Sequence, residues 1–260
     1  MPLEALLFDV DGTLADTEEG HRTAFNLAFD RLRLGWEWGR EEYRELLGVA
    51  GGKERMARYV DGLQVGERER SRLREQIPAI HAEKTRLYAA MAGDGAIALR
   101  PGVARLLAEA RQAGLKLAIA STTTRANIEA LLRATLGGEG LAMFDTIACG
   151  DEVAAKKPSP DVYLLALRRM GAAAAASVAF EDSANGLRAA VAAGLATVVT
   201  PTFWTSDGDW SSARLVLPHL GDPWQPLPGE PGNALHCAAW LTLAELERLA
   251  PRRRAGALIG

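Results

Sequence analysis

Little in this sequence suits a secreted, membrane-spanning or nucleic-acid-binding protein. It contains 2 cysteines among 260 residues, too few for a disulfide framework, so we expect a reducing, cytoplasmic environment. No uninterrupted apolar run approaches ~20 residues, the length that spans a bilayer. The chain enters an apolar segment at Leu3, which leaves no room for a signal peptide. The formal net charge of −3 argues against nucleic-acid binding.

Internal repeats and long low-complexity stretches are also absent, and the length suffices for one large domain or for a core with a smaller cap. After residue 100, short apolar segments alternate with helical patterns. This alternation predicts an α/β fold with a Rossmann-like parallel sheet and right-handed crossovers. The expected strands are residues 3–8, 115–120, 144–148, 177–180 and 196–200, with a weaker candidate at 213–217.

A helical block separates the first expected strand from the others. We interpret this block, residues 16–99, as an α-helical cap inserted into a core of residues 1–15 and 100–222. Residues 223–260 form a C-terminal extension to which the sequence assigns no clear role. Its short basic run, Arg252–Arg254, is predicted to be a solvated tail rather than a partner-binding site.

Two local signals describe the helices of the cap. Asp16, with Glu19 three residues later, resembles a capping box and predicts a helix start. Pro78 falls inside a long charged helical stretch, residues 67–91, and is expected to kink or split it.

Two aspartates, Asp9 and Asp11, directly follow the first expected strand and precede Gly12. Because side chains alternate along a strand, both carboxylates leave on the same side. Such a pair makes sense if a cation holds it, or if one carboxylate attacks a substrate and the other moves protons. An ordinary strand-end turn rich in Asp and Gly is the alternative for this segment taken alone.

Polar side chains also follow the next expected strands, and ligands of parallel sheets bind beyond the carboxyl ends of the strands. These side chains are a hydroxyl cluster suited to anions, a lysine pair that can neutralise a phosphoryl group, and an acidic pair: Ser121–Thr123, Lys156–Lys157 and Glu181–Asp182. Each has a simpler explanation as a helix cap, a solvated loop or a helix start. Together, after four successive strands, they predict one active site.

The chain resembles the haloacid dehalogenase-like phosphohydrolases. The resemblance covers residues 1 to about 205 and rests on four segments in the family's order: Phe8–Leu14, Ala120–Thr122, Lys157–Asp161 and Glu181–Gly186. The helical insertion is similar to the small cap of the phosphoglucomutase-like branch. These motifs are specific for fold and chemistry and much less specific for the substrate.

The resemblance implies catalysis by Asp9, which would attack phosphorus and form an aspartyl-phosphate, and by Asp11, which would act as general acid and base. It also implies Mg²⁺ as the cofactor, held by Asp9, Asp182 and the backbone carbonyl of Asp11, with Glu181 acting through a water. The charge on the phosphoryl oxygens would be stabilised by Ser121, the N–H of Thr122 and Lys157. Lys156 competes for the lysine role, but the family's lysine immediately precedes the proline.

The cap must recognise the rest of the substrate, and physical reasoning leaves its residues open. The segment Gly51–Arg55 suits a second anionic group, but an exposed inter-helix turn is slightly favoured. His21 on an apolar face is more often a core residue than a catalytic one. His81, Lys84 and Tyr88 share a helical face that a mixed surface stripe also explains.

These cap segments are similar to the CbbY-type subgroup, which includes phosphatases that convert xylulose-1,5-bisphosphate to xylulose 5-phosphate. The resemblance implies that the turn at Gly51–Lys53 grips the distal phosphate and that Glu18 and Tyr43 meet sugar hydroxyls. The expected substrate-binding set is Glu18, His21, Tyr43, Gly51, Gly52, Lys53, Glu54, Arg55, His81, Lys84, Ser121, Thr122 and Thr123.

Three rival functions stay open at this point. A sugar-phosphate mutase of the β-phosphoglucomutase type would keep the same core residues, and so would a phosphatase of another phosphosugar. A non-catalytic binding domain is the rival from another class, although every expected acid, hydroxyl and lysine is present. The expected partner is a small phosphosugar, without nucleic acid or membrane, and we expect a monomer.

Overall fold

A parallel β-sheet forms the centre of the core in this computed structural model, which describes residues 2–93, 97–229, 235 and 239–250. Within these residues the sheet has six strands in the order β3-β2-β1-β4-β5-β6, and every pairing is parallel. The strands are β1 (Ala5–Phe8), β2 (Lys116–Ser121), β3 (Thr146–Cys149), β4 (Ser177–Glu181), β5 (Ala196–Val199) and β6 (Leu215–Val216). The predicted fold class and all the expected strands are confirmed.

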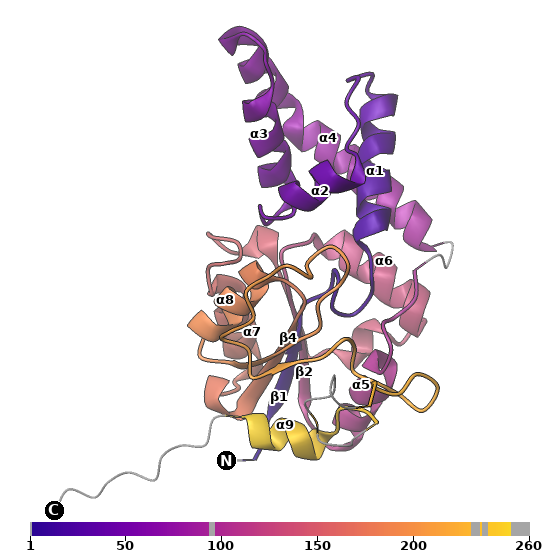
Figure 1. Ribbon diagram of the computed structural model, residues 1–260, viewed down its shortest axis with the longest axis vertical. Coiled ribbons are helices and arrows are strands. Elements are labelled where there is room, and N and C mark those ends of the chain that lie inside the picture. The colour runs from indigo at the N-terminus through magenta and orange to yellow at the C-terminus, as the bar shows by residue number, and fades with distance from the viewer. Residues whose placement is uncertain (1, 94–96, 230–234, 236–238, 251–260) are drawn as a thin grey trace, which may run out of the picture.

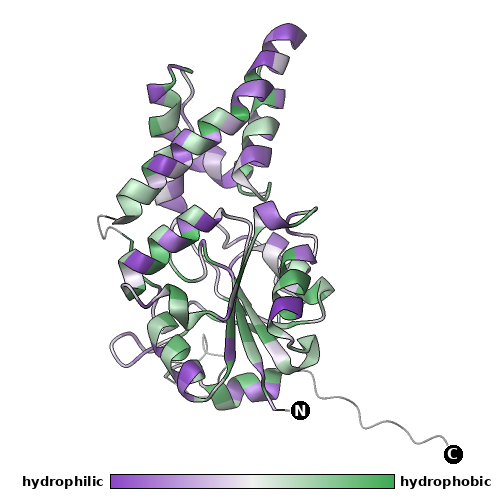
Figure 2. Ribbon diagram, turned by 180° about the vertical axis from the view of Figure 1, so that it is seen from behind, coloured by the Kyte–Doolittle hydropathy of each residue, from purple (hydrophilic) through white to green (hydrophobic). Residues whose placement is uncertain are grey.

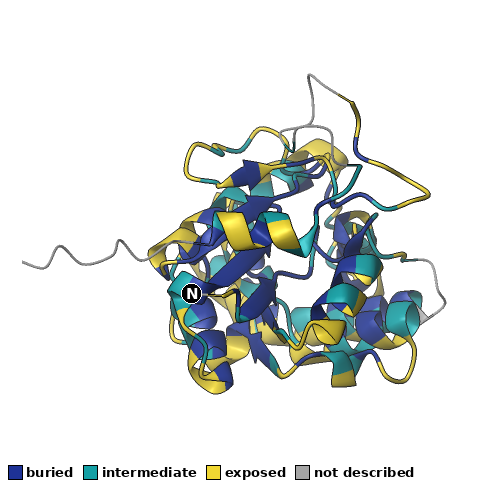
Figure 3. Cartoon of the chain, turned by 90° about the horizontal axis from the view of Figure 1, so that it is seen from below, coloured by how far each residue is buried: buried dark blue, intermediate teal, exposed yellow. Residues whose placement is uncertain are grey.

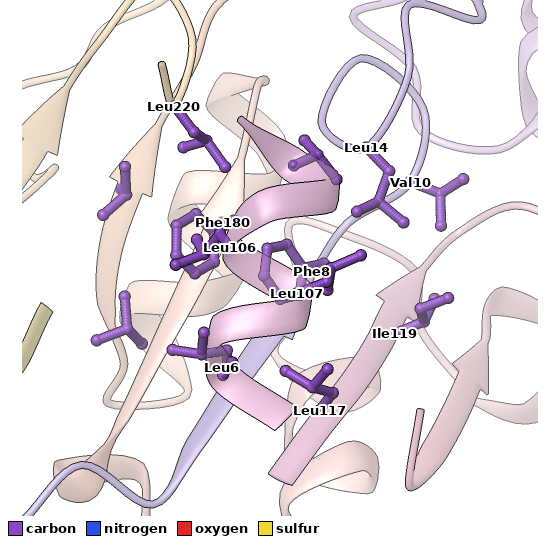
Figure 4. Close-up of a cluster of buried hydrophobic side chains, with 14 of the residues drawn as sticks. Leu6, Phe8, Val10, Leu14, Leu106, Leu107, Leu117, Ile119, Phe180 and Leu220 are labelled. Carbon is purple, nitrogen blue, oxygen red and sulfur yellow. The ribbon is translucent and has the colours of Figure 1, made fainter. Parts of the chain in front are cut away.

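Alternating side chains of the central strand β1 face two layers of helices. Phe8 points to the layer of α5 (Val103–Gln112) and α6 (Arg125–Leu136), where its ring stacks on Phe180 at 4.4 Å between centroids (Figure 4). Leu7 points to the opposite layer, built from α7 (Asp161–Met170) and α8 (Ala184–Ala192). On that face the sheet residues are mostly alanine, which lets the helices approach closely. Figure 3, seen from below, shows the buried strands enclosed by helices with exposed outer turns.

The cap lies beyond the carboxyl ends of the strands (Figure 1). Its described helices are α1 (Glu18–Arg31), α2 (Arg40–Leu46), α3 (Gly52–Gly62) and α4 (Glu67–Gly93). An aromatic cluster holds them together, with Phe25, Phe29, Trp38 and Tyr43 all buried. Figure 2 shows hydrophobic residues along the central strands, whereas the cap helices mix hydrophobic and hydrophilic residues.

The structure contradicts one expectation for the cap and part of another. The capping box at Asp16 does not form, because α1 begins at Glu18 and the preceding Thr17 makes no side-chain cap. The Thr17 hydroxyl instead donates to the Asp11 carboxylate at 2.6 Å. Pro78 does not split α4, which continues through it, since Ile77 and Ile80 on either side are buried in the cap's core.

The described part of the C-terminal extension packs on the core at the end of the sheet opposite the cap (Figure 1). Its helix α9 (Leu243–Leu249) starts at a capping box of Thr242 and Glu245 and buries Leu246 in the core cluster. Cys149 is a free, buried thiol, whereas Cys237 and Arg252–Arg254 lie outside the described residues. No helix among the described residues is long and apolar enough to cross a membrane.

Candidate active site

Buried carboxylates and one ammonium meet at the carboxyl ends of β1 and β4. Lys157 Nζ donates to Asp9 Oδ1 at 2.6 Å and to Glu181 Oε1 at 2.5 Å. Asp9, Glu181 and Asp182 each offer a carboxylate oxygen, and these oxygens all lie within 4.8 Å of one another. The structure therefore brings together side chains that are up to 173 positions apart, from Asp9 to Asp182.

The charges of this cluster do not balance. Burial, reinforced by Glu181 and Asp11 and opposed by Lys157, raises the pKa of Asp9 to about 7. Burial and the neighbouring carboxylates also raise the pKa of Asp182 well above its usual range. Burial by itself would lower the pKa of the Lys157 ammonium. The charges and hydrogen bonds of Asp9 and Glu181 outweigh burial, so the pKa is raised. One cation thus faces three buried acids.

The residues present fit Mg²⁺. Its preferred ligands are hard oxygens, and a divalent cation would supply the positive charge that the acidic cluster lacks. Glu181 Oε2 is buried and finds no hydrogen-bond partner among the described residues, as expected for an oxygen that binds a metal-bound water. Asp9, Asp182 and the backbone carbonyl of Asp11 would hold the ion directly.

Gly12 lets the loop after β1 approach the second acidic pair. Its φ is 83°, in the region that favours glycine, and a Cβ there would lie 2.2 Å from Asp182 Oδ2. The Arg100 guanidinium holds the same loop by donating to the Gly12 carbonyl and, at 2.5 Å, to the Thr200 carbonyl. Arg100 was not among the predicted site residues, since nothing in the sequence marks it except its place at the cap–core junction.

A chain of hydrogen bonds from the cap holds Asp11. His21 Nε2 lies 2.8 Å from Asp11 Oδ1, and Lys84 Nζ lies 2.7 Å from His21 Nδ1. Because an ammonium only donates, Nδ1 accepts and Nε2 carries the hydrogen that is donated to Asp11. Burial works against the Asp11 charge, but the hydrogen bonds that His21 and Thr17 donate, together with the positive charge of Lys84, hold the pKa of Asp11 well below its usual range.

The hydroxyl cluster faces the site because another residue caps the following helix. Thr124 is the N-cap of α6 and accepts from Asn127 N at 3.4 Å. Ser121 is buried, its Oγ accepts from Thr123 N at 3.3 Å, and it lies on the cavity wall with Thr122. The simpler explanation of Ser121–Thr123 as helix caps therefore does not hold, because the cap of α6 is Thr124.

A cavity between core and cap joins most of the predicted site residues. It is lined by Asp9, Asp11, Glu18, His21, Gly51, Gly52, Lys53, Arg55, His81, Lys84, Ser121, Thr122, Thr123, Lys157 and Asp182. Other lining residues are outside the predicted set, among them Asp151, Asn127, Ser183, Asn185 and Thr205, and Lys156 was expected only as an alternative to Lys157. Ser183 and Asn185 lie within the recognised motif Glu181–Gly186, and Thr205 lies in the segment Phe203–Thr205, which is similar to the CbbY-type subgroup, so both segments could have identified them.

Three predicted residues, Tyr43, Glu181 and Glu54, do not line the cavity. Tyr43 is fully buried, and its hydroxyl donates to Glu18 Oε2 at 2.7 Å and accepts from Arg55 Nη1 at 3.0 Å. Its expected contact with sugar hydroxyls is therefore not what the structure shows, because Tyr43 holds Glu18 in place instead. Glu181 is enclosed with Lys157, and Glu54 pairs with Lys156 at 2.8 Å.

Comparisons with known proteins agree with this geometry. The family model described as "Hydrolase: haloacid dehalogenase-like hydrolase" matches residues 3–194. The chain is 52% identical to the plasmid-encoded protein CbbY of Cupriavidus necator over 94% of this chain and 95% of that protein. It is 39% identical to a CBBY-like protein of Arabidopsis thaliana over 84% of this chain and 70% of that protein.

Solved structures give the same result. A variant of CbbY from Rhodobacter sphaeroides, in complex with xylulose-(1,5)bisphosphate, is 49% identical and has a TM-score of 0.78 over 84% of this chain and 94% of that chain. A putative β-phosphoglucomutase from Thermotoga maritima is 26% identical, with a TM-score of 0.59 over 83% of this chain and 94% of that one. The chain therefore belongs to the haloacid dehalogenase-like hydrolases, where it is a phosphatase of the CbbY type.

Proposed function

We propose that this protein is a Mg²⁺-dependent phosphatase that converts xylulose-1,5-bisphosphate to xylulose 5-phosphate and phosphate. One observation carries the proposal: Asp9 is buried within 2.6 Å of Lys157 and beside Asp182, at the base of a cavity that cap residues close. Mg²⁺ would be held by Asp9, Asp182 and the Asp11 carbonyl, and it would offset the negative charge of the phosphoryl group.

The chain's own residues supply the two chemical steps. A carboxylate oxygen of Asp9 bonds to phosphorus while the ester P–O bond breaks, and the leaving oxygen takes a proton from Asp11. Water then attacks the aspartyl-phosphate and gives a proton to Asp11, so that phosphate leaves and both aspartates are regenerated. Asp11 enters the first step protonated and the second step ionised. Its pKa is low without substrate, and the negative charge of a bound phosphoryl group would raise it. Lys157 and Ser121 offset charge on the transferred oxygens.

Two features support a bisphosphate as the substrate. The CbbY of R. sphaeroides binds xylulose-(1,5)bisphosphate with the same overall fold. In this chain the cavity has cations at two places, with Lys157 at the acidic cluster and Lys53, Arg55 and Lys156 around the turn of α3. Lys157 together with Mg²⁺ would offset the charge of the reacting phosphate, and the cations around the turn of α3 would offset that of the other.

A product assay tests the proposal. Purified enzyme is given xylulose-1,5-bisphosphate and ribulose-1,5-bisphosphate side by side, and both inorganic phosphate and the sugar product are measured. We expect xylulose 5-phosphate and phosphate in equal amounts, loss of turnover when EDTA removes divalent metal, and loss of turnover in Asp9→Asn. An isomeric phosphosugar without net phosphate release would identify a mutase instead. Full activity in Asp9→Asn would reject the assigned nucleophile.

A further inference from the structure

Two consecutive lysines of the core serve different parts of the cavity. Lys157 Nζ is turned to Asp9, whereas Lys156 Nζ is 2.8 Å from the carboxylate of Glu54 on the cap helix α3. Both lysines line the same cavity. The Lys156 side chain is 17% exposed, so it is within reach of a ligand, and the Glu54 side chain is 45% exposed.

Lys156 lies directly against the glycine turn that opens α3. A Cβ on Gly51 would meet Lys156 Nζ at 2.9 Å and Glu54 Oε2 at 2.2 Å. Gly51 has a φ of 95°, so both its conformation and its surroundings exclude a side chain. Because Arg55 N donates to Gly51 O, the preceding amides of the turn have no helical acceptor. The Lys156 ammonium and these backbone amides therefore lie on the same part of the cavity wall.

Other charged groups around the turn at Gly51 also favour the binding of an anion. Lys53 on the cap faces Asp151 of the core at 3.6 Å, which mirrors the Lys156–Glu54 pair across the same boundary. Burial and the cations Lys84, Lys53 and Lys156 lower the pKa of His81 to about 4. Both ion pairs are partly exposed, and such pairs contribute little to stability, so a doubly charged phosphate can displace their carboxylates.

We infer that Lys156 is a specificity-determining residue, which gives up its ion pair with Glu54 to bind the second phosphate of a bisphosphate substrate. This inference rests on the proposed function and extends it from the cap to the core. The loop that carries Lys157 to the reacting phosphate would then carry Lys156 to the other one. The core segment Lys156–Lys157 would then bind both phosphates of the substrate, with the cap closed over them.

A matched pair of substrates tests this inference. Xylulose-1,5-bisphosphate and xylulose 1-phosphate share the reacting phosphate and differ only in the second one. For wild type and variants, we measure the ratio of kcat/KM for the bisphosphate to that for the monophosphate. We expect Lys156→Met to lower this ratio roughly tenfold to hundredfold, mainly through the KM of the bisphosphate, as for the loss of a charged hydrogen bond. Lys156→Arg should recover part of the ratio.

Two further variants separate binding from a purely structural role. Glu54→Gln frees the Lys156 ammonium, so the ratio should be kept or raised. If the ratio falls as far as in Lys156→Met, the ion pair only holds cap and core together, and the inference is overturned. Lys116→Met removes an equal charge at a site outside the cavity and should leave the ratio unchanged. If the wild type does not hydrolyse the bisphosphate, the proposed function fails. If the wild type prefers the bisphosphate and Lys156→Met keeps that preference, only the inference fails.

Discussion

His21 of the cap lies 2.8 Å from Asp11 of the core, so the imidazole of one domain touches the proposed acid–base group of the other. Lys84 Nζ, 2.7 Å from the second ring nitrogen, fixes which nitrogen carries the hydrogen. The proposed acid–base residue Asp11 is therefore oriented by hydrogen bonds from Thr17 and from His21 of the cap. This contact links substrate enclosure to catalysis.

The first prediction concerns His21→Ala. Asp11 loses a hydrogen-bond donor and its orientation, so we expect kcat to fall by about 10- to 100-fold, below the full value of a general acid–base group. KM for the substrate should change less than kcat. His219→Ala, at a histidine that does not line the cavity, should keep kcat. An unchanged kcat in His21→Ala would show that the contact has no catalytic role.

A second prediction concerns Gly12→Ala. The added Cβ would lie 2.2 Å from Asp182 Oδ2 at a φ of 83°, so the carboxylate that we propose as a metal ligand must move. We expect loss of at least about 100-fold in kcat/KM, together with a destabilisation on the order of 1–3 kcal/mol. Gly171→Ala is the matched control, since its φ is 59° and nothing lies within 4 Å of the new Cβ. That variant should show the backbone strain without the loss of turnover.

Trp204 gives a prediction for the cap–core interface. It belongs to a loop of the core, yet it is buried in the aromatic cluster of the cap, with its ring 5.7 Å from that of Tyr43. Trp204→Ala should lower the free energy of unfolding by about 3–5 kcal/mol. It should also raise the KM for the substrate, because Trp204 packs on Tyr43, which holds Glu18 at the cavity wall. Urea denaturation and steady-state kinetics measure the two effects. Trp224, which is 94% exposed, should tolerate alanine within about 0.5 kcal/mol.

The fourth prediction is a pH dependence that originates in Lys84. Burial, opposed by the charges of Asp11 and Glu18, lowers the pKa of this ammonium to about 8. Since kcat/KM reports the free enzyme, it should decline as the pH rises above about 8, where the cavity loses a positive charge. The decline should be absent in Lys84→Met, whose kcat/KM starts lower. A wild-type profile that is flat to pH 10 would contradict this assignment.

The same group affects stability with a definite sign. Between pH 8 and the ordinary lysine value of 10.5, the unfolded chain holds a proton that the folded protein has released. The free energy of unfolding therefore gains a contribution that rises with pH in this window. Thermal or urea denaturation of wild type and Lys84→Met at matched pH values measures it as the difference between the two curves.

The sequence by itself determined the strands and the core motifs. Apolar segments alternating with helical patterns fixed the sheet, and the carboxyl ends of parallel strands share one edge, so Asp9, Lys157 and Asp182 could be expected together. Local signals were less reliable. Asp16 did not cap its helix, because α1 begins at Glu18 and Thr17 takes the N-cap position, with its hydroxyl donated to Asp11.

Only the tertiary structure decided how the cap meets the core. The pairs His21–Asp11 and Lys156–Glu54 join residues on separate domains, and no spacing along the chain encodes such a contact. Tyr43 was expected at the substrate but lies behind Glu18, because its ring is needed in the cap's aromatic core. A helical pattern tells which face of a helix is buried, whereas the angle at which two domains pack selects which side chain reaches the cavity.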